Sequence, residues 1–254
     1  DVLLEKARVE RAVLNDPEST QKSLLRAFEE DVSHRPTLSA MLAFAEGGGS
    51  PELAMLALGR LVALAVDIDE RIKRLLELGE LNEFQLSDLG AALDCYNRIL
   101  DLRPVQTDGL WGAARIELSR SHWRSGFRYL EILEGRLGSL TSARRIEVLY
   151  ALARCGYELN DMASCKESLA ALLDLDGRHR EGLELALRIN LDGEEHEAAL
   201  RHAKLQLLFY GSEMDSRKRA DKHYLMGAIN ERLGFSEEAK TCFESALVED
   251  DTHG

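Results

Sequence analysis

Few residues of this chain have the type and spacing that catalysis or metal binding requires. His196 lies among acids in the segment GEEHEAAL, but no second histidine follows at the H-E-x-x-H spacing that brings two imidazoles to one zinc ion. The segment DLDG (174–177) begins like a calcium loop, yet RHREG follows where further acidic ligands are needed. The G-x-S-x-G motif of serine hydrolases is absent from the sequence. We therefore expect no enzymatic activity, no metal and no cofactor.

The cysteines show no metal-binding pattern. They lie ten or more residues apart, with no C-x-x-C pair, at Cys95, Cys155, Cys165 and Cys242. A metal site or a disulfide stays open as an alternative, but this spacing favours small apolar side chains in the core of a reduced, cytoplasmic protein.

The segment GGGS (47–50) contains three consecutive glycines, which a helix interior disfavours. It predicts a flexible joint, either a natural loop or an engineered linker that replaces a deleted one. The patterns G-x-x-x-x-G-K-[ST] and G-x-G-x-x-G are both absent, so the joint is not expected to bind phosphate.

Composition predicts an all-α fold. The 254 residues include only four prolines and 6% aromatics, while Leu, Ala, Glu and Arg dominate, and no segment alternates as a strand does. The formal net charge of −13 argues against nucleic acid, whose phosphates need a basic face. No uncharged apolar run reaches 18 residues, so no membrane insertion is expected. Because the sequence begins at Asp1 rather than Met, we expect it to be part of a longer protein.

Five segments share one pattern of small and apolar residues. A small residue recurs at intervals of 34, 39, 34 and 40 positions, at Ala92, Gly126, Cys165, Ala199 and Ala239. Twelve positions before the last four of these anchors lie Ala114, Ala153, Leu187 and Gly227. Four and seven positions after the five anchors lie Tyr96 and Ile99, Leu130 and Leu133, Leu169 and Leu172, Ala203 and Gln206, and Phe243 and Ala246. Spacings of three, four and seven place such residues on one helical face, which predicts repeated pairs of closely packed helices.

This pattern resembles the tetratricopeptide repeat, a 34-residue helix–turn–helix unit. In that family a small residue, a turn glycine, an alanine, an aromatic residue and a second alanine follow in order; here the last unit supplies Gly227, Gly234, Ala239, Phe243 and Ala246. It ends in Asp251 where the family usually has proline, although Pro104 supplies that proline in an earlier unit. The resemblance extends over 73–253 and is only partial over 1–72.

The resemblance implies a right-handed α-solenoid of about six hairpins. We divide the chain into degenerate repeat helices (1–46), the glycine-rich joint (47–50), further degenerate repeats (51–106) and four tetratricopeptide-like repeats (107–254). Within the first part, 7–17 is interpreted as the second helix of a truncated repeat, and 20–30 pairs with 36–45.

In this family the first helix of each hairpin lines a concave groove. By the resemblance, the groove positions hold three arginines beside three aromatic residues, which are Arg115, Arg154 and Arg188 with Trp111, Tyr150 and Tyr224. These six residues are the predicted peptide-binding site. The alternative is that they pair within their own helices, as Trp111 with Arg115, Tyr150 with Arg154, and Glu184 with Arg188. The Lys and Asn residues of the family's carboxylate clamp are missing, so that activity is not expected.

The resemblance implies a protein-interaction scaffold or adaptor that binds a protein segment, acidic or extended, in its groove. Two other functions stay open. The chain could be a regulatory or substrate-docking region of a larger enzyme. It could also be a structural subunit, in a homo-oligomer or larger complex, whose groove a neighbouring chain or its own terminal helix fills.

Overall fold

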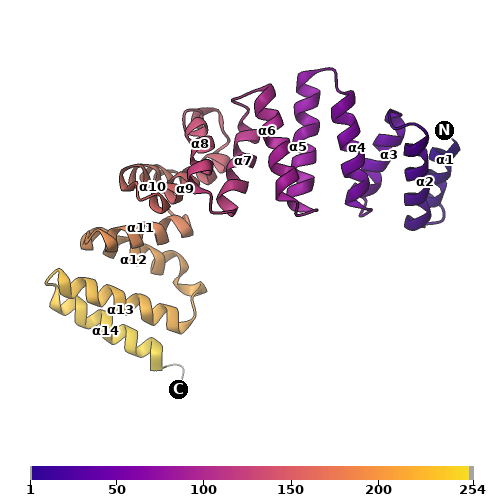
Figure 1. Cartoon of the computed structure of the whole chain (residues 1–254). Coiled ribbons are helices and arrows are strands. Elements are labelled where there is room, and N and C mark those ends of the chain that lie inside the picture. The colour runs from indigo at the N-terminus through magenta and orange to yellow at the C-terminus, as the bar shows by residue number, and fades with distance from the viewer. Residues whose placement is uncertain (1, 252–254) are drawn as a thin grey trace. The chain divides into compact units, whose positions relative to one another are not determined.

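The computed structural model describes residues 2–251, and every regular element in that range is a helix (Figure 1). The α-helices are α1 (Val2–Ala12), α2 (Pro17–Glu30), α3 (Arg35–Glu46), α4 (Pro51–Leu64), α5 (Ile68–Phe84), α6 (Leu89–Leu102), α7 (Thr107–Ser119), α8 (Trp123–Glu134), α9 (Ser142–Glu158), α10 (Met162–Leu175), α11 (Arg180–Asp192), α12 (His196–Tyr210), α13 (Ser216–Arg232) and α14 (Ser236–Asp251). Two short 3-10 helices, η1 (Leu137–Ser139) and η2 (Gly211–Glu213), precede α9 and α13. The all-α prediction is confirmed.

Consecutive helices pair into seven hairpins within this range, α1 with α2 through to α13 with α14. Each hairpin turn contains one residue in the left-handed conformation, and these residues are Asn15, Gly48, Ser87, Ser121, Asn160, Glu194 and Gly234. The following N–H reaches back to the helix: that of Asp161, for example, donates to the Gly156 carbonyl at 2.7 Å. Such a bond satisfies a carbonyl that the helix end leaves open. The predicted turn at Gly234, with φ 82°, is confirmed.

The repeated positions of the sequence pattern form the inside of the hairpins. All five anchors are buried, as are the four residues twelve positions before them. Of the ten residues that follow the anchors, only Phe243 is half-buried, and the others are buried. The repeat register that the spacing predicts therefore identifies the inward-facing residues of five consecutive hairpins correctly.

Glycines allow the helices of a hairpin to approach closely. A Cβ atom on Gly156 would lie 2.8 Å from the backbone nitrogen of Cys165, so α9 and α10 are in backbone contact there. A Cβ atom on Gly79 of α5 would lie 2.9 Å from the Tyr96 ring of α6, and one on Gly227 would lie 2.6 Å from the Phe243 ring. Small residues on first helices thus leave the space that large residues of second helices fill.

The N-terminal hairpins differ from the sequence interpretation. Helix α1 is the first helix of a hairpin with α2, whereas 7–17 was expected to be a second helix. Helix α3 pairs with α4 across the glycine-rich segment, rather than with α2. An Asn-Asp-Pro sequence fits either the end of a repeat or a hairpin turn. Here the left-handed Asn15 and the Asp16 side chain, which accepts the Ser19 N–H at 3.1 Å, make it a turn.

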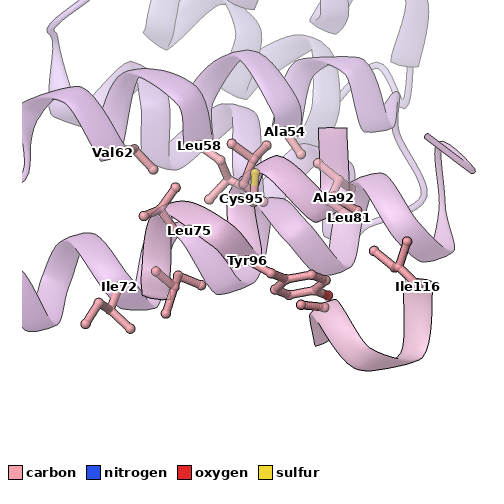
Figure 2. Close-up of a cluster of buried hydrophobic side chains, with 13 residues drawn as sticks. Ala54, Leu58, Val62, Ile72, Leu75, Leu81, Ala92, Cys95, Tyr96 and Ile116 are labelled. Atoms are coloured by element: carbon pink, nitrogen blue, oxygen red, sulfur yellow. The ribbon is translucent and has the colours of Figure 1, made fainter. Parts of the chain in front are cut away.

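The helices form two compact units, residues 1–136 and 137–254. In the first unit a buried cluster surrounds Tyr96, whose ring lies among residues from α4 to α7 (Figure 2). A second cluster joins α1 to α4 around Leu38 and Met41. The second unit has one cluster between α9, α10 and α11 and another between α11, α12 and α13. Each cluster contains residues of neighbouring hairpins, as expected of a stacked repeat. Among the described helices, none has the length and apolar character needed to cross a bilayer.

We predict that the Gly156→Ala substitution destabilises the protein by about 1–3 kcal/mol, because the added methyl group meets the backbone of α10, which must move. The control is Gly59→Ala on α4, where no atom lies within 4 Å of the new Cβ. That change should stabilise by roughly 0.5–1 kcal/mol through helix propensity. Urea denaturation followed by circular dichroism measures both. If the two substitutions shift stability in the same direction, the close approach at Gly156 is wrong.

The four thiols should differ in reactivity. Burial raises the pKa of Cys95 and Cys165 to about 11 and that of Cys155 to about 12, whereas Cys242 is half-buried. At pH 8 a thiol of pKa 11 is ionised to roughly one part in a thousand, and only the thiolate reacts. Ellman's reagent should therefore modify Cys242 first and the other three only on unfolding. Two or more fast thiols in the folded protein, or a fast phase that survives Cys242→Ser, would contradict this packing.

Candidate peptide-binding surface

The six residues predicted to bind a peptide lie on four first helices. Trp111 and Arg115 are on α7 in the first unit, whereas Tyr150 and Arg154 on α9, Arg188 on α11 and Tyr224 on α13 belong to the second. The predicted set is thus divided into a pair in one unit and four residues in the other.

Arg115 is engaged with helix α5. Its guanidinium donates two hydrogen bonds to the Glu83 carboxylate, from Nε to Oε1 and from Nη2 to Oε2, each 2.6 Å long. The guanidinium carbon also lies 4.9 Å from the centre of the Phe84 ring. Two parallel bonds in this forked arrangement fix the orientation of both side chains. Arg115 therefore connects α7 to α5 instead of stacking on Trp111.

The Glu83 side chain is 8% exposed and has a second partner, the Tyr96 hydroxyl, which donates to Oε2 at 2.9 Å. Burial raises the pKa of Tyr96 above its ordinary value, and the bond to Glu83 raises it further. Trp111 is 9% exposed, so packing already uses most of its surface. In the first unit, the predicted Arg115 thus belongs to a half-buried network with Glu83 and Tyr96 that joins α5, α6 and α7, and the predicted Trp111 is buried.

In the second unit Tyr150 is half-buried beside the start of α11. Its ring centre lies 5.1 Å from that of His179, whose Nδ1 accepts the Gly182 N–H at 3.0 Å and so caps the helix. Burial raises the pKa of Tyr150, and Arg154 and Arg188 oppose the rise through their positive charges. Arg154 and Arg188 thus belong to the charges that act on the Tyr150 hydroxyl, together with Glu181 and Glu184, which raise its pKa.

Arg154 and Arg188 are both exposed. The guanidinium carbon of Arg188 lies 5.9 Å from the centre of the Tyr157 ring. Among the described residues, Arg188 has no ion pair with Glu184, the partner that the alternative interpretation gave it. The helix face between α9 and α11 therefore presents two guanidinium groups beside two tyrosine rings.

Tyr224 is 64% exposed at the other side of this unit. Its ring centre lies 5.4 Å from that of Phe243, and both rings line an open hollow of about 830 Å³ with Leu247. The volume is within the range of ligand pockets, roughly 300–1,000 Å³. Tyr224 thus leaves much of its ring exposed in this hollow.

Sequence reasoning missed Lys222 on α13. Burial lowers its pKa, and the charge of Glu184 on α11 opposes that shift. With Tyr150, Arg154, Arg188 and Tyr224, Lys222 forms what we call the unit-2 face. Repeat spacing gave no signal for it, because the interval between these two units is 40 positions and the equivalent of Arg188 is Ala228.

The described residues contain no group of three or more His, Cys, Asp and Glu side chains that could hold a metal ion. The unit-2 face brings together cationic and aromatic side chains, with Glu181 and Glu184 of α11 among the charges that act on them. Such groups recognise carboxylates and apolar side chains through ion pairs, hydrogen bonds and ring contacts.

Neither a family model nor a curated protein matches the sequence. Solved structures are similar to the fold. The C-terminal part of a TPR repeat-containing protein from Cytophaga hutchinsonii has a TM-score of 0.63 at 12% identity, over 98% of this chain and 96% of that one. A tetratricopeptide repeat protein from Parabacteroides merdae has a TM-score of 0.52 at 15% identity, over 97% and 91%.

A third similar structure is YrrB, described as a TPR protein with an unusual peptide-binding site. Its TM-score is 0.55 at 15% identity, and the match covers 71% of this chain and 87% of YrrB. At such identities the likeness concerns the fold. It agrees with the seven hairpins, the left-handed turns and the buried anchors described above. The chain has the fold of the tetratricopeptide-repeat proteins, an all-α solenoid of helical hairpins.

Proposed function

We propose that this chain is a non-catalytic protein-interaction scaffold that binds a protein segment across its first helices. The observation that carries the proposal is the unit-2 face, where Tyr150, Arg154 and Arg188 gather on α9 and α11, and Tyr224 lies exposed on α13. In stacked repeats the first helices form a continuous binding surface. YrrB, which has a similar fold, is described as having an unusual peptide-binding site, and this supports the proposal by analogy only.

The chemistry of the face favours an extended segment with acidic and apolar residues. Exposed ion pairs contribute about 0–1 kcal/mol each, so two arginines alone would give weak, salt-sensitive binding. The affinity must come mainly from Tyr150 and Tyr224, whose rigid rings bury apolar surface at a small entropic cost. The arginines then favour acidic partners and set the register of the segment.

Trp111 and Arg115 have a supporting role in this proposal. The charge of Arg115 is matched by Glu83, and Trp111 is buried, so they contribute by holding α7 against α5.

Selection from a displayed peptide library tests the proposal directly. We expect the wild-type chain to enrich peptides with acidic residues beside aromatic or aliphatic ones. The double substitution Arg154→Glu plus Arg188→Glu should weaken the selected peptides about tenfold or more, with the loss greatest at low salt. Tyr224→Ala should weaken them at every salt concentration. The control is Arg201→Glu, an exposed residue on the second helix α12, which should change nothing. Equal binding by the double variant and the control would refute the unit-2 face.

The supporting role of Arg115 generates a separate stability prediction. Glu83→Gln should destabilise the first unit by about 1–3 kcal/mol, because it leaves the Arg115 charge without its carboxylate. Glu80→Gln, an exposed neighbour on α5, should change stability by at most about 0.5 kcal/mol. Thermal unfolding of the two variants measures both changes in stability. Equal unfolding midpoints would mean that the pair with Glu83 does not stabilise the unit, and Arg115 would again be a candidate for binding a partner.

A further inference from the structure

Two hollows occupy equivalent places in successive hairpins of the first unit. One lies between the first helices α1 and α3, with Thr20 and Leu24 of α2 in its lining. The other lies between the first helices α3 and α5, with Ala54 and Leu58 of α4 in its lining. Their volumes are about 360 and 440 Å³. Because the repeat relates the two places, the hollows open on the same face, one hairpin apart.

The hollow between α1 and α3 is apolar and positively charged. Its apolar lining includes Leu4, Ala7, Leu24, Ala40, Ala43 and Phe44. The charged residues in its lining are Arg8 and Arg11, and no carboxylate lines it. Arg11 lies over the Phe44 ring, with its guanidinium carbon 6.0 Å from the ring centre, and Arg8 pairs with Glu5 on the exposed side of α1. The charge of the residues that line this hollow is therefore positive, whereas the whole chain has a net charge of −13.

The hollow between α3 and α5 is apolar and negatively charged. Its apolar lining includes Leu42, Ala45, Ala54, Leu58, Leu81 and Phe84. Three glutamates and one arginine also line it, and Arg74 is paired with Glu77 at 2.8 Å. Among the described residues, Glu46 and Glu80 make no ion pair, so the hollow has an uncompensated charge of about two carboxylates.

The position of Glu46 points to an external cation. Glu46 is the last residue of α3, where the negative end of the helix dipole disfavours a carboxylate by roughly 0.3–1 kcal/mol. Phe84, at the edge of the same hollow, is 62% exposed. An arginine or lysine of a partner would relieve the repulsion at Glu46 and could stack on the ring.

We infer that the first unit binds an extended protein segment whose two halves have opposite charge. The acidic half lies over Arg8 and Arg11, the basic half lies over Glu46 and Glu80, and each half inserts an apolar side chain into its hollow. Neighbouring helices pack roughly 8–10 Å apart, and a strand advances about 3.3 Å per residue, so about three residues separate the two anchors. This surface is distinct from the unit-2 face, and the inference does not depend on it.

The test uses synthetic peptides of one composition, with two Glu, two Lys and two Leu. In one peptide the charges are segregated into an acidic and a basic half; in the other they are interleaved. Fluorescence anisotropy with the full chain should show at least about tenfold tighter binding of the segregated peptide. All proteins carry Arg154→Glu and Arg188→Glu, so that binding at the unit-2 face cannot produce the result.

Charge reversal should then change the preference in a defined way. With Arg8→Glu plus Arg11→Glu both hollows are acidic, so the segregated peptide should lose at least about tenfold and an all-Lys analogue should bind best. With Glu46→Lys plus Glu80→Lys an all-Glu analogue should bind best. The control is Glu29→Lys plus Glu30→Lys on exposed positions of α2, which should keep the wild-type order. Circular dichroism confirms that each variant is folded.

Equal affinity for segregated and interleaved peptides would overturn the inference. So would an unchanged preference after either reversal in a folded protein. If each half-peptide binds as tightly as the whole, the hollows serve two separate partners, and the single-segment inference is wrong.

Discussion

The close approach of the two helices in each hairpin constrains the rest of the structure. At Gly156 the approach leaves no room for a methyl group, and at Gly79 and Gly227 it leaves room only for the ring of the facing helix. The chain can make such contacts only if it reverses within a few residues, which requires a left-handed residue in every hairpin turn. Once these turns are set, the second helices fill the core, and one side of each first helix remains available to other molecules.

Repetition at a nearly constant period also explains where the charged residues find partners. Residues about one repeat apart occupy equivalent places in neighbouring hairpins, so pairs such as Arg35 with Glu70 and Arg115 with Glu83 connect successive hairpins. We propose recognition roles instead for charged residues that are exposed, which are Arg154 and Arg188 in the second unit and Arg8, Arg11, Glu46 and Glu80 in the two hollows of the first unit.

Spacing in the sequence predicted the fold well because close packing leaves a periodic trace of small residues. The anchors from Ala92 to Ala239 were all found buried. The helix pairing of the N-terminal hairpins was predicted wrongly. Their turns contain Asn15 and a run of glycines, and residues of these types occur both within hairpins and between them. The candidate site was harder to predict. The repeat spacing predicts that Arg115 lies on the side of its helix that lines the groove. Only the packed structure shows that Glu83 already binds it.

The central claim is that first helices bind partners while second helices hold the stack together. Hydrogen–deuterium exchange of the full chain, with and without a peptide selected by display, tests it most directly. The account predicts slower exchange on peptide binding in α9, α11 and α13, and no change in α10, α12 and α14. Slowing confined to the second helices would contradict the account, because the partner would then bind the opposite side of the hairpins.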